Sequence, residues 1–207
     1  MEESEKSTSR INESWVPSRK ESLIPRPPSS LTSHLQTLYL FTASDIIPVL
    51  CPQLLFALSS ILNPSLHTST PDTLTILTHL PHALLWIWLH LLLLGLSNQR
   101  QRASIAEDAV NKPWRPIPSG RLDQHHARYL LLCMIPVTYM LSHYVLGATF
   151  ETAALFVFNW IYNDLDAAED LVLRNVLNVL GMTTIGVGAR AVLTGESVYA
   201  MSDEGMM

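Results

Sequence analysis

The sequence predicts an all-α integral membrane protein, a helical bundle with about five transmembrane helices. Hydrophobic residues make up 48% of the 207 residues and charged residues only 15%, whereas a typical soluble domain carries roughly a quarter charged residues. The apolar residues also gather into blocks of membrane-spanning length that polar loops separate. The formal net charge of −5 argues against a protein that binds nucleic acid, and two cysteines argue against a disulfide-framed secreted domain.

Composition divides the chain into three segments. Residues 1–36 are rich in Ser, Glu, Lys, Arg and Pro and cannot bury enough apolar surface to fold, which predicts a disordered cytosolic arm. Residues 37–194 form the predicted transmembrane domain, and residues 195–207 form a short tail. The transmembrane domain contains five apolar blocks, at 38–62, 77–96, 128–146, 148–162 and 175–193. The first three reach the length of roughly 20 helical residues that a bilayer requires, while the short fourth and the glycine-rich fifth fit less well.

The basic residues predict how these blocks cross the membrane. All but one of the 13 Lys and Arg residues lie in the arm, in the loop 98–127 with Arg128 at its end, or just before the fifth block. By the positive-inside rule, the arm and this loop face the cytosol and the tail faces the lumen. We expect a multi-pass protein of the endoplasmic reticulum, embedded in the lipid bilayer. A soluble helical bundle is the alternative, but the segment LLWIWLHLLLLGL in the second block has no polar face.

The loop that follows the second block has the residue types of a metal and phosphate site. Its stretch NQRQRASIAEDAVNKPWRPIPSGR, at 98–121, places two adjacent carboxylates, Glu107 and Asp108, among the cations Lys112, Arg115 and Arg121. Carboxylate oxygens bind Mg²⁺, and Lys and Arg neutralise phosphate charge, so the stretch suits a diphosphate carried with Mg²⁺. An alternative stays open from the residues alone, namely a basic segment that anchors to anionic lipid.

Loss of a diphosphate from an allylic carbon leaves a carbocation, which needs a dry aromatic pocket. Candidates for its lining are Trp86 and Trp88 in the second block and Tyr139 and Tyr144 in the third. Two histidines inside the blocks, His90 and His143, are interpreted as bonding neighbouring helices rather than as catalytic groups.

The string DAVNKPWRPIPSGR, from Asp108 to Arg121, resembles the end of the first aspartate-rich motif of the UbiA prenyltransferase superfamily. The stretches LYLFTASDI and YNDLDAAEDLVLRNVLNVLG, at 38–46 and 162–181, resemble a fungal branch with membrane-bound terpene cyclases and prenyltransferase-like proteins. The resemblance implies an intramembrane enzyme, usually of nine spans, that binds a prenyl diphosphate with Mg²⁺ between two aspartate-rich cytosolic loops. It implies that Asp108 binds the metal with Glu107 as a substitute ligand. It also implies that Lys112, Arg115 and Arg121 contact the diphosphate.

The chain departs from the family pattern upstream of Asp108. The pattern places metal-binding side chains four and eight residues earlier, where this sequence has Ser104 and Arg100. Asn98 and Asp45 are therefore weaker candidates for the site, and the alternative for Asp45 is a structural role at a kink near Pro48.

A second group of acidic residues precedes the fifth block and consists of Asp164, Asp166, Glu169 and Asp170. It is interpreted as structural, favouring the dipole of the following helix, rather than as a second metal-binding loop.

These features favour Mg²⁺-dependent ionisation of a prenyl diphosphate, farnesyl diphosphate, to a terpene in secondary metabolism. Prenyl transfer to an aromatic acceptor is one alternative. The other is an inactive, C-terminally truncated membrane protein, because the chain ends after five blocks without a second aspartate-rich motif. The sequence assigns no catalytic residue.

Overall fold

The computed structural model describes residues 30–63 and 72–195, and all of its regular structure is helical. The elements are α1 (Leu31–Thr42), the π-helical turn η1 (Ile46–Leu50), α2 (Cys51–Ile61), α3 (Thr73–Gln99), α4 (Arg102–Asn111), α5 (Gln124–Leu141), the π-helical turn η3 (Ser142–Leu146), α6 (Thr149–Asp164) and α7 (Leu171–Thr194). The described part of the chain contains no strand, which confirms the all-α fold class. Most of the predicted arm and nearly all of the tail lie outside the described residues, but residues 31–36 are helical, so the arm prediction was wrong there.

Three helical stretches are long and apolar enough to cross a membrane: Thr73–Gln99, Gln124–Leu146 and Leu171–Thr194. A fourth span is formed if α1 and the η1–α2 stretch count as one, although the two parts meet at an angle of 61°. The helix α6, which matches the fourth predicted block, has only 16 residues. The five predicted blocks are thus all helical, while three to four of them have the character of a span.

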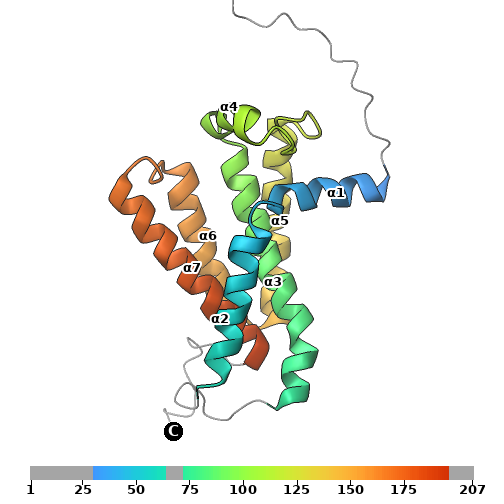
Figure 1. Ribbon diagram of the computed structural model, residues 1–207, viewed down its shortest axis with the longest axis vertical. Helices are drawn as coiled ribbons and strands as arrows, with labels where there is room; N and C mark the ends of the chain where they lie inside the picture. The colour runs from blue at the N-terminus through green and yellow to red at the C-terminus, as the bar shows by residue number, and fades with distance from the viewer. Residues whose placement is uncertain (1–29, 64–71, 196–207) are drawn as a thin grey trace, which may run out of the picture.

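The bend in the first predicted block has a local cause. Pro48 has no backbone N–H to donate, so one hydrogen bond of the α-helical ladder is lost there. The backbone instead widens into η1, where Leu50 N donates to Asp45 O over 3.3 Å. Gln99 Nε2 donates to Phe41 O over 2.8 Å, which ties the end of α1 to α3. The first block is therefore a broken helix, and α1 extends sideways from the bundle (Figure 1).

The long helices begin at aspartate caps. Asp72 accepts from Thr75 N at the start of α3, and Asp123 accepts from His126 N at the start of α5. Asp170 accepts from Val172 N and Leu173 N at the start of α7. Such side chains satisfy backbone N–H groups that have no partner inside the helix. The predicted structural role of the second acidic group is thereby confirmed for Asp170.

The helix α3 runs through the centre of the bundle and packs against α7, α5 and α1, while α7 also packs against α2 and α6. Small residues let α7 approach closely. A Cβ atom at Gly188 would lie 2.2 Å from Cη2 of Trp86, so only glycine fits there. Trp86 is fully buried, and its Nε1 donates to Thr152 Oγ1 of α6 over 3.1 Å. These contacts fix α6 and α7 against α3.

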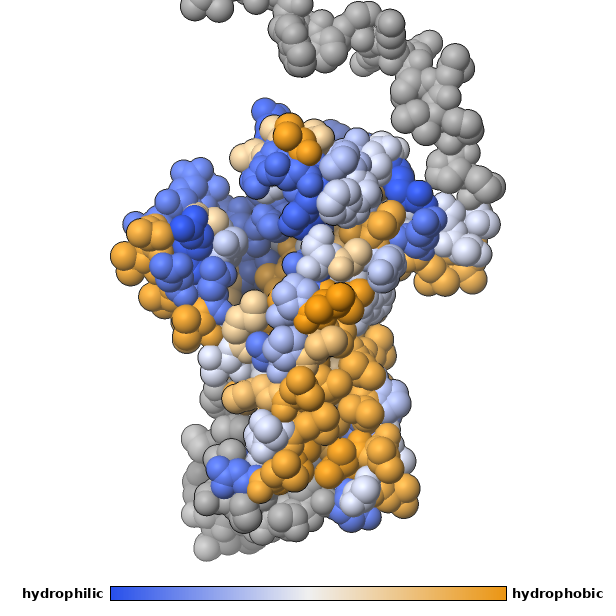
Figure 2. Space-filling model, in the orientation of Figure 1, coloured by the Kyte–Doolittle hydropathy of each residue, from blue (hydrophilic) through white to orange (hydrophobic). Residues whose placement is uncertain are grey.

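Polar residues gather at one end of the bundle. Figure 2 shows hydrophilic side chains over α4 and the α6–α7 turn, and hydrophobic side chains over much of the opposite end. Arg121 of the predicted loop donates to Gln36 of α1, and Arg100 pairs with Asp164 of α6, so the predicted loop, α1 and the end of α6 meet at this end. Their orientation in a membrane stays a prediction. Within the predicted loop 98–127, residues 102–111 form the helix α4.

Candidate functional site

A cavity of about 420 Å³ opens at the polar end of the bundle, and this volume lies within the usual range for small-molecule sites. Its walls come from η1, α3, α4 with the residues after it, α6 and α7. The part near α4 is lined by polar side chains, namely Asn98, Ser104, Glu107, Asp108, Lys112 and Arg115. The part further along α3 is mainly apolar, with Leu91, Leu94, Leu155, Phe156 and Ile185. The cavity thus combines a charged end with an apolar end.

The turn after α4 brings the basic residues back over this cavity. The helix α4 ends at Asn111, just before Pro113, and the chain then folds through a series of tight turns. Arg115 N donates to Lys112 O over 3.0 Å, and Arg121 N donates to Pro116 O over 2.9 Å. Prolines fix the backbone of this stretch, and Gly120 supplies a positive φ of 73°. This folding places the Arg115 side chain beside Asp108.

Asp108 and Arg115 form a buried ion pair at the charged end of the cavity. Nη1 of Arg115 lies 2.9 Å from Oδ1 and 2.7 Å from Oδ2 of Asp108. The two residues are only 5% and 6% exposed, and a charge at that depth requires a partner. Arg115 Nε is also buried, and it has no hydrogen-bond partner among the described residues. The residues predicted to bind metal and diphosphate therefore bind each other.

The weaker candidates from the sequence also reach this cavity. Asn98 lines it and accepts a hydrogen bond from Ser104 Oγ over 3.2 Å. Asp45 lines it from the bend between α1 and η1, where the positive charges of Arg115 and Lys112 act on its carboxylate. Asp45 makes no side-chain cap at the bend.

Arg121 lies elsewhere. It does not line the cavity, and its Nη2 donates to Oε1 of Gln36 over 2.8 Å. Its predicted place beside Lys112 and Arg115 is therefore not what the structure shows, because the turns after Pro116 direct it towards α1.

The donor set fits a metal that arrives with a phosphate ligand. Within residues 30–63 and 72–195, no group of three His, Cys, Asp or Glu side chains is arranged to hold a metal ion. Mg²⁺, however, is commonly bound by one or two protein carboxylates together with substrate phosphates. Asp108 and Glu107 provide two carboxylates in one cavity, beside two cations that suit phosphate. These residues fit a magnesium–diphosphate group better than a bare ion.

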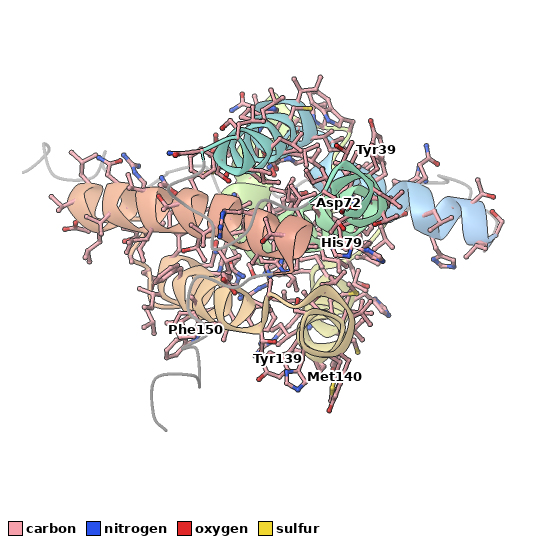
Figure 3. The ribbon with its side chains drawn as sticks, turned by 90° about the horizontal axis from the view of Figure 1, so that it is seen from below. Tyr39, Asp72, His79, Tyr139, Met140 and Phe150 are labelled. Carbon is pink, nitrogen blue, oxygen red and sulfur yellow. The ribbon has the colours of Figure 1, made fainter. Side chains whose placement is uncertain are left out.

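The aromatic lining differs from the one expected. Trp86 is buried in the helix contacts described above, and Trp88 Nε1 donates to Thr42 Oγ1 over 3.2 Å. Tyr139 and Tyr144 are exposed, and Tyr139 points away from the bundle (Figure 3). The expectation for these four residues was wrong, because they face the helix contacts or the outer surface. The aromatic residues of the cavity are Phe156, Phe158 and Tyr162, all from α6.

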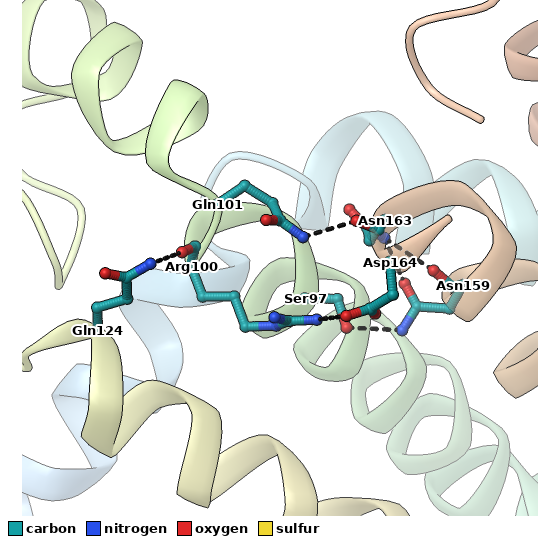
Figure 4. A network of polar contacts seen from close by, with 7 residues as sticks. All are labelled: Ser97, Arg100, Gln101, Gln124, Asn159, Asn163 and Asp164. Carbon is teal, nitrogen blue, oxygen red and sulfur yellow. Dashed lines mark hydrogen bonds and ion pairs between the residues drawn. The ribbon is translucent and has the colours of Figure 1, made fainter. Parts of the chain in front are cut away.

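A second polar network joins three helices at the edge of the cavity, which its members Asn159 and Asn163 also line (Figure 4). Arg100 pairs with Asp164, and Gln101 Nε2 donates to Asn163 O over 2.7 Å. Gln124 Nε2 at the start of α5 donates to Arg100 O over 2.8 Å. The network continues along α6, where Asn163 donates to Asn159 and Asn159 donates to Ser97 of α3. It holds the ends of α3, α5 and α6 together. Asp164 thus ends α6 and pairs with Arg100, whereas the sequence interpretation related it to the dipole of the following helix.

Comparison with known proteins gives one informative relative. No family model matches the sequence, and no solved structure matches it. The chain is 28% identical over 165 residues to the fumagillin beta-trans-bergamotene synthase of Aspergillus fumigatus. The aligned region covers 79% of this chain and 52% of that protein, so the chain spans about half the length of this curated relative.

Proposed function

We propose that this protein is a UbiA-type terpene cyclase that ionises a prenyl diphosphate with the help of Mg²⁺. The proposed prenyl diphosphate is farnesyl diphosphate. The observation that carries the proposal is the cavity, which has the carboxylates and cations of a diphosphate site at one end and apolar walls at the other. Similarity to a beta-trans-bergamotene synthase supports the terpene product, and the resemblance of residues 108–121 supports the superfamily.

Each group at the charged end has a defined part in this proposal. Asp108 and Glu107 would hold Mg²⁺, which stabilises the leaving diphosphate when it is bound. Lys112 and Arg115 would neutralise the remaining phosphate charge, Arg115 through the planar guanidinium whose Nη1 now binds both Asp108 oxygens. Arg121 is left out, since it binds Gln36 outside the cavity.

The apolar end suits the carbocation that ionisation produces. Phe156, Phe158 and Tyr162 present aromatic rings to the cavity, and ring faces attract positive charge. Leu91, Leu94, Leu155 and Ile185 exclude water, which would otherwise capture the cation.

The test is product formation by the full 207-residue chain in membranes supplied with farnesyl diphosphate and Mg²⁺. We expect release of pyrophosphate and a terpene hydrocarbon, both lost with EDTA and in the variants Asp108→Asn and Lys112→Gln. Asp164→Asn is the matched control and keeps turnover, because Asp164 pairs with Arg100 and does not line the cavity. Prenylation of an added aromatic acid without hydrocarbon would instead support a prenyltransferase. Absence of pyrophosphate release would support a protein without this activity.

We also propose the membrane orientation. The protein would be multi-pass in the endoplasmic reticulum, with the N-terminal arm and residues 98–127 in the cytosol, since these regions hold most of the basic residues. In a variant without Cys51 and Cys133, Ser119→Cys should react with an impermeant maleimide from the cytosolic side, and Asp72→Cys should not. The reverse labelling would overturn the orientation.

A further inference from the structure

His90 of α3 stands out in the apolar part of the cavity. It lines the cavity, and it is only 2% exposed. Its Nδ1 lies 2.8 Å from the backbone carbonyl oxygen of Trp86, one turn earlier in the same helix. Its Nε2 is buried and has no hydrogen-bond partner in the part of the chain that the structure describes.

The contact with Trp86 fixes which ring nitrogen carries the proton. A backbone carbonyl only accepts hydrogen bonds, so Nδ1 must carry the hydrogen that it donates. In the neutral ring, Nε2 then holds a lone pair and can accept a proton. The sequence interpretation, that His90 bonds a neighbouring helix, was wrong, because its hydrogen bond stays within α3.

A purely structural role leaves Nε2 unexplained. A buried acceptor without a partner destabilises a fold, and an apolar side chain of similar size would avoid that cost. The ring packs on Trp86 with centroids 4.1 Å apart and lies 6.2 Å from the Phe156 ring, contacts that an aromatic hydrocarbon could also make. The basic nitrogen is thus the feature that packing does not require.

The position of His90 matches the reaction that the charged end would start. His90 precedes Asn98 by eight residues on α3, which corresponds to roughly 12 Å along the helix axis. A prenyl chain whose diphosphate is bound near Asp108 and Lys112 would extend along α3 towards His90. Ionisation places the positive charge first at the carbon that loses the diphosphate, and attack by the distal double bonds moves it along the chain. The lone pair of Nε2 would then lie in the apolar region that the cyclised carbocation occupies.

Resting on the proposed function, we propose that His90 is the general base that ends the reaction. A C–H bond next to the cationic carbon breaks, and its electron pair forms the new C=C bond of the hydrocarbon. The proton moves to Nε2, which gives an imidazolium ion. That proton passes to water that enters the cavity when the product leaves, which restores the base.

The experiment separates ionisation from deprotonation. The full chain in membranes is supplied with farnesyl diphosphate and Mg²⁺, and pyrophosphate release and the ratio of hydrocarbon to alcohol are measured. His90→Gln and His90→Phe should still release pyrophosphate, but the ratio of hydrocarbon to alcohol should fall about 100-fold, the scale of a lost general base. Water then captures the cation that no base deprotonates. His143→Gln, at an exposed histidine outside the cavity, should leave the ratio unchanged.

Two results would overturn this role. One is an unchanged hydrocarbon-to-alcohol ratio in both His90 variants, which would assign deprotonation to another group, such as the released diphosphate. The other is a parallel loss of pyrophosphate and hydrocarbon in both variants together with a lower unfolding temperature, which would make His90 structural. A wild-type chain that releases no pyrophosphate would reject the proposed function itself.

Discussion

Two aspartate–arginine pairs lie at the polar end of the bundle, and they differ in what surrounds them. Asp108 and Arg115, seven residues apart, are buried and face the cavity through a two-point contact. Arg100 and Asp164 are 64 residues apart, and their side chains are 14% and 35% exposed. The amides of Gln124 and Gln101 bind the backbone carbonyls of Arg100 and Asn163 next to this pair. The first pair has groups that a metal and a phosphate would also bind, whereas the second joins helix ends. The same two residue types therefore lie in different environments, and burial beside a cavity distinguishes them.

Asp108→Ala should have the largest effect. The substitution leaves the Arg115 guanidinium buried without its carboxylate, and breaking such a pair costs about 3–5 kcal/mol of unfolding free energy. It also removes the predicted metal ligand, so pyrophosphate release should fall about 100-fold or more, as expected when charge stabilisation at a leaving group is lost. Thermal unfolding in detergent and pyrophosphate release measure the two effects.

Asp164→Ala is the matched control for that substitution. It removes a carboxylate of the more exposed pair, in which the Asp164 side chain is 35% exposed, so the loss of unfolding free energy should be about 1 kcal/mol, and turnover should persist. Equal losses of activity in the two variants would contradict the distinction between the pairs.

Arg115→Lys sharpens the comparison, because it keeps the charge and removes the planar fork. Both hydrogen bonds to Asp108 come from Nη1 of Arg115, and the shorter lysine side chain would not place its ammonium group where Nη1 now lies. We expect a loss of about 1.5–3 kcal/mol, the worth of a hydrogen bond to a charged group, and weaker binding of the diphosphate. The measurement is the KM for farnesyl diphosphate beside the unfolding temperature. An unchanged KM would remove Arg115 from the diphosphate site.

The exposed pair should show a small coupling in a double-mutant cycle. Arg100→Ala, Asp164→Ala and the double variant should give a coupling energy of about 0.2–1 kcal/mol, which added salt should reduce. A coupling of about 3 kcal/mol or more, on the scale of a broken buried pair, would contradict the partial exposure of Asp164.

The sequence predicted much of this end of the molecule, because its signals are local. The string from Asp108 to Arg115 supplied the charged residues in consecutive positions, and the apolar blocks supplied the helices. The pairing of Asp108 with Arg115 was not predictable, since it depends on the turns after Pro113. Phe156, Phe158 and Tyr162 were missed because only the packing of α6 against α3 and α7 decides which of its faces lines the cavity. The amides Asn159 and Asn163, which interrupt an apolar helix, were the signal that pointed to that face.

Asp123 extends the comparison to a carboxylate whose partner is a histidine, His126, instead of an arginine. Its substitution should have the smallest effect. The hydrogen bonds that it accepts from the backbone N–H and the side chain of His126 hold the pKa of Asp123 below its ordinary value. A carboxyl with a lowered folded-state pKa stabilises the fold above its unfolded pKa of about 3.9, and this contribution is lost as the pH falls through the folded value. Asparagine also caps helices but does not titrate in this range. Asp123→Asn should therefore lose less stability than the wild type between pH 6 and acidic pH, as measured by unfolding temperature. An identical pH dependence in both proteins would show that the charge of Asp123, unlike that of Asp108, contributes nothing to the fold.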